Sequence, residues 1–187
     1  MAVAPLLAVC LIMVDARQPS SAEIAPIARL KLENLEGEEI VIGDLLEEGM
    51  VLFDFWATWC KPCQLALPEM QRVYEEYHDR GLTVIGISVD GPRNFSKVRP
   101  FANRLSLTFP LVLDTTGELQ RAFKVTAIPT SILIDSAGVV LKVRQGYRPG
   151  EGKEYAKLME ELLPEAPPDS LDAEQEADST GTSTSSS

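Results

Sequence analysis

An apolar run ends four residues before a pair of closely spaced cysteines, and this arrangement constrains the fold more than any other feature of the chain. Residues 50–56 are apolar except for Asp54, which is typical of a strand buried on both faces. Beyond Cys60, apolar residues recur at helical spacing, and Gly81 is expected to end the helix. The sequence therefore predicts a buried strand that leads into a helix, with Cys60 and Cys63 where the two meet.

The remaining segments predict one sheet covered by helices. We expect a β-hairpin over 27–42, a second buried strand over 82–89 and a helix over 94–105. A short strand over 111–113 and a short helix over 117–123 follow, then antiparallel strands over 131–134 and 139–143. Tyr155, Leu158, Met159 and Leu162 lie on one face of a closing amphipathic helix. These elements indicate an α/β layered sandwich around one mixed sheet.

The length of 187 residues suits one domain with additional terminal segments. We place an apolar leader at 1–22, the domain at 24–164 and an acidic Ser/Thr-rich tail at 165–187. That tail has almost nothing to bury, so it is predicted to be disordered. The net charge of −11 argues against nucleic acid and anionic membrane surfaces as partners.

The first residues resemble an export signal. Residues 2–14 carry no charge and have the length of a signal-peptide apolar region, while a bilayer-spanning helix needs about 20 residues. No Lys or Arg precedes the run, which is atypical for such a signal. The prediction is export, to the periplasm or to its side of a membrane, with an uncleaved leader as the one route to membrane attachment. The alternative is an unstructured apolar end on a cytoplasmic protein.

The cysteine pair is better explained by reactivity than by structure. Of the three cysteines, Cys10 lies in the leader, so the predicted domain contains Cys60 and Cys63 alone. A bridge across two residues closes too short a loop to stabilise a fold much. A structural zinc site needs four ligands, and His78 is the one strong ligand that could join the pair. We therefore expect neither a metal nor an organic cofactor, and we interpret His78 as a surface residue.

The predicted position of the pair explains how it could react. At the start of a helix, the helix dipole favours the thiolate of Cys60, and the nearby Lys61 adds to this effect. Cys63 lies one turn further and is expected to point inward, where burial keeps its thiol protonated. Pro62 suits the first turn, where its missing N–H costs nothing. Cys60 would then attack and Cys63 would resolve the mixed disulfide, beside the apolar surface of Trp56 and Trp59.

Residues 53–63, Phe-Asp-Phe-Trp-Ala-Thr-Trp-Cys-Lys-Pro-Cys, resemble the active-site strand and turn of the thioredoxin superfamily. Residues 126–130, Thr-Ala-Ile-Pro-Thr, resemble its second signature, and Pro68 and Gly146 fall at family positions. The resemblance, over 28–163, implies a thioredoxin-like fold, a Cys60–Cys63 disulfide and a cis Ile128–Pro129 bond that packs against it. The leading hairpin and the insert over 91–113 look more like the TlpA-like and ResA-like branch, mostly extracytoplasmic proteins that include reductants for cytochrome c assembly.

Two positions depart from that branch. Ala66 stands where the branch commonly carries Glu, and Asp54 stands where it often carries Asn. Because burial raises the pKa of a carboxyl, Asp54 could exchange protons near neutral pH. We hypothesise that Asp54 is the acid/base partner of Cys63; the alternative is a carboxylate at the strand rim, hydrogen-bonded to backbone.

The combined prediction is a monomeric thiol–disulfide oxidoreductase that exchanges electrons with protein substrates and with an upstream donor. Its expected catalytic residues are Cys60, Cys63 and Asp54, and its expected substrate-binding residues are Trp59, Lys61, Pro62, Ile128 and Pro129. The Lys61–Pro62 dipeptide favours the reducing direction. Two alternatives stay open: a peroxiredoxin-like peroxidase, and a redox-inert binding module.

Overall fold

The computed structural model describes residues 27–164. The predictions for the leader and for the acidic tail lie outside these residues. Within 27–164, no helix has both the length and the apolar character needed to cross a bilayer.

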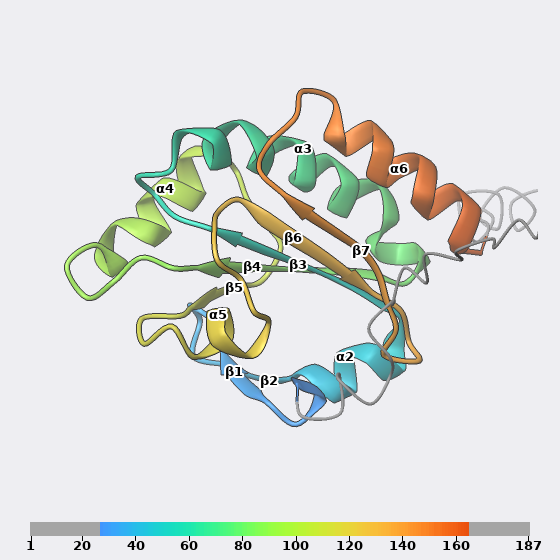
Figure 1. The fold of residues 1–187 in the computed structure, drawn as a ribbon, viewed down its shortest axis with the longest axis horizontal. Coiled ribbons are helices and arrows are strands. Elements are labelled where there is room, and N and C mark those ends of the chain that lie inside the picture. The colour runs from blue at the N-terminus through green and yellow to red at the C-terminus, as the bar shows by residue number, and fades with distance from the viewer. Residues whose placement is uncertain (1–26, 165–187) are drawn as a thin grey trace, which may run out of the picture.

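A five-stranded mixed sheet forms the centre of the described chain, in the order β5-β4-β3-β6-β7 (Figure 1). Strand β3 pairs in parallel with β4 on one side and antiparallel with β6 on the other. It is therefore the middle strand, buried on both faces as its sequence predicted. The strands are β3 (Met50–Trp56), β4 (Leu82–Ser88), β5 (Leu111–Leu113), β6 (Thr130–Ile134) and β7 (Val140–Gln145).

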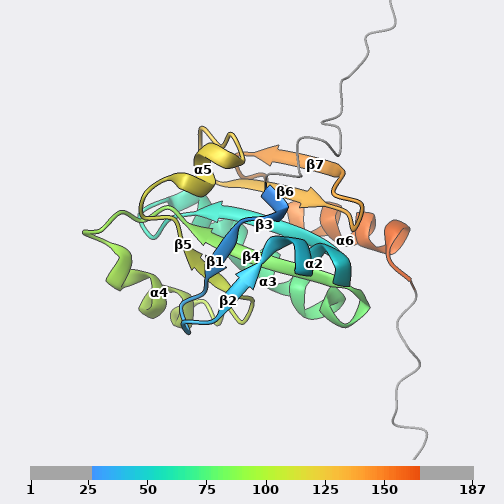
Figure 2. The same cartoon turned by 90° about the horizontal axis from the view of Figure 1, so that it is seen from below.

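Alternate residues of β3 belong to two different cores. Leu52 and Trp56 pack with α3 (Lys61–Tyr77), α4 (Val98–Arg104) and α6 (Glu151–Leu162) on one face of the sheet. Phe53 and Phe55 pack on the opposite face, which carries α2 (Ile42–Glu48) and α5 (Glu118–Ala122). Figures 1 and 2 show the sheet between these two layers. The predicted α/β sandwich is confirmed.

The N-terminal hairpin forms, but as a separate two-stranded sheet. Strand β1 (Lys31–Glu33) pairs antiparallel with β2 (Glu39–Val41), and the hairpin contacts β5 through a bridge between Asn34 and Val112. The prediction that the strand includes Ile42 was wrong, because α2 begins there. Ile42 and Leu46 are buried at a spacing of four residues, which is the spacing of one helix face.

Two prolines lie within predicted helices without ending them. Pro68 is inside α3, which runs to Tyr77 and continues as the 3₁₀ turn η1 (His78–Arg80) before the left-handed Gly81. Pro100 is the third residue of α4, within the first turn, where backbone N–H groups have no acceptor inside the helix. The missing N–H of Pro100 therefore removes no helical hydrogen bond. The first predicted turn of α4 is instead the 3₁₀ turn η2 (Phe95–Lys97).

Candidate active site

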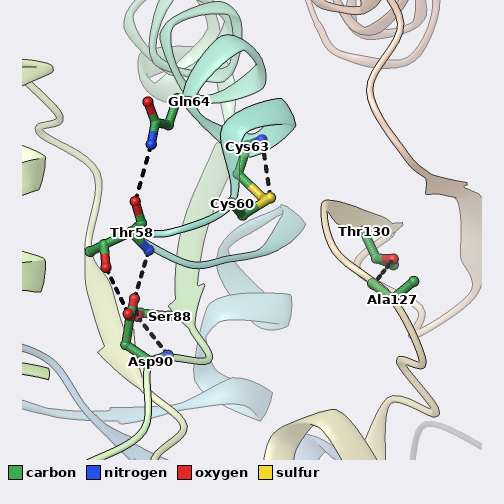
Figure 3. The surroundings of a disulfide bond; sticks show 8 residues. All are labelled: Thr58, Cys60, Cys63, Gln64, Ser88, Asp90, Ala127 and Thr130. Atoms are coloured by element: carbon green, nitrogen blue, oxygen red, sulfur yellow. Dashed lines mark hydrogen bonds between the residues drawn. A yellow bond between two sulfur atoms is a disulfide. The ribbon is translucent and has the colours of Figure 1, made fainter. Parts of the chain in front are cut away.

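The two cysteines lie where β3 leads into α3, as predicted, and are joined by a disulfide (Figure 3). Cys60 is the N-cap of α3 and Pro62 is its second residue. The backbone N–H of Cys63 donates to Cys60 Sγ over 3.2 Å. Cys60 keeps 6% of its surface exposed and Cys63 keeps none. The outer sulfur is thus the one that a partner can reach first.

These contacts favour ionisation of Cys60 when the pair is reduced. A thiolate at the N-cap accepts from the free N–H groups of the first turn and is stabilised by the positive end of the helix dipole. Lys61, exposed beside it, adds a cation. The geometry is that of a reactive outer thiol with a buried resolving thiol one turn away.

A carboxylate just after the neighbouring strand β4 holds the loop before the cysteines. Asp90, which is fully buried, accepts from the backbone N–H of Thr58 at 2.8 Å and from its hydroxyl at 2.7 Å. Ser88 also donates to Asp90, and Gln64 donates to the carbonyl of Thr58 (Figure 3). We did not predict this clamp, although a polar Ser-Val-Asp step directly after a buried strand was a signal for it.

The second signature is placed against the cysteines. The Ile128–Pro129 peptide bond is cis, as the resemblance implied. Ile128 packs against the core cluster that contains both cysteines. Gly146, at the end of β7, has φ of +78° and donates its N–H to the carbonyl of Pro129 over 2.8 Å. A residue with a Cβ would be strained at this φ, which explains the glycine.

Asp54 is buried in the middle of β3, with 2% of its surface exposed. Its Oδ2 atom has no hydrogen-bond partner in the structure. Burial, with a smaller contribution from the charge of Glu151, raises the pKa of Asp54 to about 7. Asp54 therefore lies in the interior of the strand, whereas the alternative interpretation placed it at the strand rim.

Comparisons with known proteins agree with this geometry. Residues 23–143 match the AhpC/TSA family, which is more than half of the chain. The sequence is 36% identical over 135 residues to the thiol-disulfide oxidoreductase ResA of Halalkalibacterium halodurans, covering 72% of this chain and 74% of that one. The chain belongs to the AhpC/TSA family. Within that family it is a thiol–disulfide oxidoreductase of the thioredoxin fold, in the branch that includes ResA.

Solved structures of this family branch have the same fold. A putative thiol:disulfide interchange protein DsbE from Chlorobium tepidum superimposes with a TM-score of 0.64 at 27% identity, covering 71% of this chain and 91% of that one. StoA from Bacillus subtilis superimposes with a TM-score of 0.58 at 31% identity, covering 68% and 95%.

The neighbours of Asp54 in this family member form a polar row across the sheet. Asp54 lies opposite Ser131 of β6, which in turn lies opposite Arg144 of β7. Because paired residues point to the same face, all three side chains lie on the α3 and α6 side. Tyr155 of α6 contacts Ser131, with 2.7 Å between the hydroxyl oxygens. Glu151 lies one turn before Tyr155 and is almost fully buried.

Strand β4 offers Asp54 no polar side chain. The residue of β4 that pairs with Asp54 is Gly86. A Cβ at Gly86 would meet Leu111 at 2.6 Å, Phe109 at 2.7 Å and the indole Nε1 of Trp56 at 3.2 Å, so the space above Gly86 is already filled by these three side chains. The polar side chains of the row therefore come from β6, β7 and α6, and their meeting with Asp54 was not predicted from the sequence.

Of the other residues considered in the sequence, Trp59 lies exposed beside the cysteines, whereas Trp56 and Ala66 are buried and His78 lies far from the cysteines. Trp59, beside Cys60, is 60% exposed, whereas Trp56 is buried and stacks on Phe101. Ala66 is buried on α3, so this face carries no carboxylate in place of the branch's Glu. His78 lies exposed at the opposite end of α3, away from the cysteines, as expected of a surface residue.

Proposed function

We propose that the chain reduces disulfide bonds of protein substrates outside the cytoplasm, with Cys60 as nucleophile, Cys63 as resolving thiol and Asp54 as proton carrier. The observation that carries this proposal is the cysteine pair at the start of α3, with the outer Cys60 accepting a backbone N–H and Cys63 buried behind it. The apolar leader supports the location.

The reaction balances as two thiol–disulfide exchanges. The thiolate of Cys60 attacks a substrate disulfide, forms a mixed disulfide and releases one substrate thiolate, which takes up a proton. Cys63 then loses its proton and attacks Cys60 Sγ, releasing the second substrate thiolate. Two electrons pass to the substrate, and the enzyme is left with the Cys60–Cys63 disulfide. An upstream dithiol donor must reduce that disulfide before the next cycle.

Asp54 is proposed to accept the proton of Cys63. It lies between Leu52 and Trp56 on the strand, and the side chains of both belong to the core cluster that contains Cys63. With a pKa of about 7, its carboxyl can take up and release a proton at neutral pH. The nearby Ala66 cannot perform that task.

Substrate contact is proposed for the residues around the exposed edge of Cys60. Trp59 offers an exposed apolar surface, and Lys61 and Pro62 lie exposed in the first turn of α3. Ile128 and Pro129 would place backbone polar groups beside an extended substrate segment. A role in cytochrome c assembly follows from the resemblance to ResA-like reductases, and we propose it as the physiological process.

The proposal is tested with a Cys10→Ser protein, so that the pair alone can react. In that background, Cys63→Ser should accumulate a mixed disulfide with a protein disulfide substrate, whereas Cys60→Ser should accumulate none and lose at least 1000-fold in rate, since no other thiolate is activated. Mass spectrometry of the trapped species reads out both. Retention of disulfide reduction in Cys60→Ser would contradict the assignment of Cys60 as nucleophile. A chain with both cysteines intact that reduces no protein disulfide would favour the redox-inert module.

The direction of electron transfer and the role of Asp54 as proton carrier need separate measurements. A reduction potential near that of thioredoxin, about −270 mV, supports a reductase, and one near −120 mV would indicate an oxidase.

Asp54→Asn should slow resolution of the mixed disulfide by Cys63 and flatten the pH dependence of that step between pH 6 and 8. An unchanged rate across that range would contradict the role of Asp54. Rapid consumption of peroxide by the purified protein would favour the peroxidase instead.

A further inference from the structure

The basic residues of the chain are unevenly placed. Residues 91–113 contain no Asp or Glu, although the whole chain has 28 acidic residues and a net charge of −11. The same segment contains four cations, at Arg93, Lys97, Arg99 and Arg104. It forms η2, α4 and β5, and Figure 1 shows α4 at the same end of the molecule as the start of α3. A local basic region therefore lies near the cysteines of an acidic protein.

A groove connects this region to the active-site loop. Thr58 and Trp59 line one side, and Lys97, Pro100, Phe101 and Arg104 are among the residues of η2 and α4 that line the other; its volume is about 470 Å³. Because Trp59 directly precedes Cys60, a segment bound in this α4 groove lies next to the reactive sulfur.

The two cations of the α4 groove are available to a ligand. Lys97 Nζ donates to the side-chain oxygen of Asn94 over 2.9 Å, and the Arg104 guanidinium lies 4.8 Å from the ring centre of Phe101. Neither forms an ion pair with a carboxylate of residues 27–164. Arg99, by contrast, is paired with Glu36 and faces the N-terminal hairpin. Lys97 and Arg104 can therefore bind carboxylates of a partner.

The groove also has an apolar component. Trp59, Pro100 and Phe101 line it, and Trp59 is 60% exposed, which is unusual for a side chain of this size in the described chain. An aromatic or aliphatic side chain would be desolvated between such surfaces, while flanking carboxylates would meet the cations. The combination selects for acidic segments that carry an apolar residue.

We propose that the α4 groove docks an acidic, apolar-containing segment of the substrate protein beside its disulfide. This inference rests on the proposed function and names the class of protein that the site accepts. The rest of the chain is negatively charged in sum, so an acidic segment is attracted to this region more than to the remainder of the molecule. The groove would then orient the substrate as well as bind it.

The test compares three peptides that differ only in flanking charge. Each contains one intramolecular disulfide and a Phe, flanked by Glu, Gln or Lys, and reduction is followed with the full chain and a dithiol donor. The Glu peptide should have the highest kcat/KM at about 20 mM salt, and this preference should shrink at about 0.5 M salt because the charges are screened. A Lys97→Glu/Arg104→Glu variant should lower kcat/KM for the Glu peptide about tenfold and raise it for the Lys peptide.

A matched variant and a small substrate separate the outcomes. Lys153→Glu/Lys157→Glu on α6 makes the same change in net charge far from the groove, and it should leave the peptide preference unchanged. Hydroxyethyl disulfide, which is uncharged, should react equally with all the proteins. Equal rates for the three peptides with the wild-type chain would overturn the docking proposal while the proposed function stands. Failure to reduce any disulfide would overturn the proposed function itself.

Discussion

A buried carboxyl group without a full set of hydrogen bonds is costly when it is charged. Asp54 is such a group, since its Oδ2 atom has no partner and the charge of the acidic Glu151 disfavours its ionised form. Both effects raise the pKa of Asp54, burial being the larger. An apolar residue at this position would avoid the cost of burial, so the presence of a carboxyl supports the proposed role of Asp54 as a proton carrier.

Glu151→Gln tests the electrostatic part of this argument. Removal of the Glu151 charge should lower the pKa of Asp54, because the like charge that disfavours its ionised form is gone. The pKa of Asp54 can be followed by carbon-detected NMR titration of the oxidised protein. Glu161→Gln, at an exposed site on the same helix, is the control and should leave that pKa unchanged. A rise in the pKa of Asp54 in Glu151→Gln would contradict the assignment.

At the scale of elements, the cysteines are positioned by contacts between two neighbouring strands and α3. The end of β3 leads into the loop that carries Thr58, and Asp90 follows β4, which is parallel to β3. Since the carboxyl ends of parallel strands meet at one edge of a sheet, the two residues are brought together. The clamp fixes the loop, and therefore the start of α3 and its N-cap sulfur.

Asp90→Asn should loosen that clamp. Asp90 accepts with both of its oxygens, whereas an amide has a single acceptor oxygen and no charge. The charge-assisted bonds to Thr58 and Ser88 are therefore weakened. We expect a destabilisation of about 1–3 kcal/mol and faster amide hydrogen exchange at Thr58. Asp114→Asn is the matched control, because Asp114 accepts from two N–H groups of α5 instead. Faster exchange at Thr58 in the control as well would argue against a local role for Asp90.

At the scale of the whole molecule, one buried acid gives the folding equilibrium a pH dependence. The folded pKa of Asp54 is about 7 and its ordinary value is 3.8, so between these values the native state binds a proton that the unfolded state has lost. The free energy of unfolding must then fall as pH rises from about 4 to about 7 and level off above that. The contribution is on the order of 4 kcal/mol.

Asp54→Asn should remove this contribution. The oxidised variant should be more stable than the wild type at pH 8, by up to about 4 kcal/mol, and equal to it near pH 4. Denaturant unfolding at the two pH values measures the difference. The control is Asp114→Asn, a buried acid on another element for which no such gain at pH 8 is expected. A variant that is less stable than wild type at pH 8 would show that Asp54 is stabilised in its charged form.

Local patterns in the sequence determined most of the fold and the reactive pair. The apolar run of β3, the helical spacing in α3 and the Cys60–Cys63 pair each depend on neighbours in the chain, so they can be predicted without the tertiary structure. The cis Ile128–Pro129 bond followed from resemblance and not from local preference, which favours trans. Helix α2 was missed because seven residues give too short a pattern to separate from the end of a strand.

Only the tertiary structure decided what surrounds the pair. Thr58 meets Asp90 across 32 residues, and Ser131 meets Tyr155 across 24, through strand register and helix docking that no local pattern encodes. The α4 groove likewise combines a loop with a helix from the insert. The sequence by itself determined which atoms react, because reactivity depends on residue type and local backbone. The fold decided the environment of the proposed proton carrier Asp54 and the lining of the α4 groove, because burial and charge depend on residues that are distant along the chain.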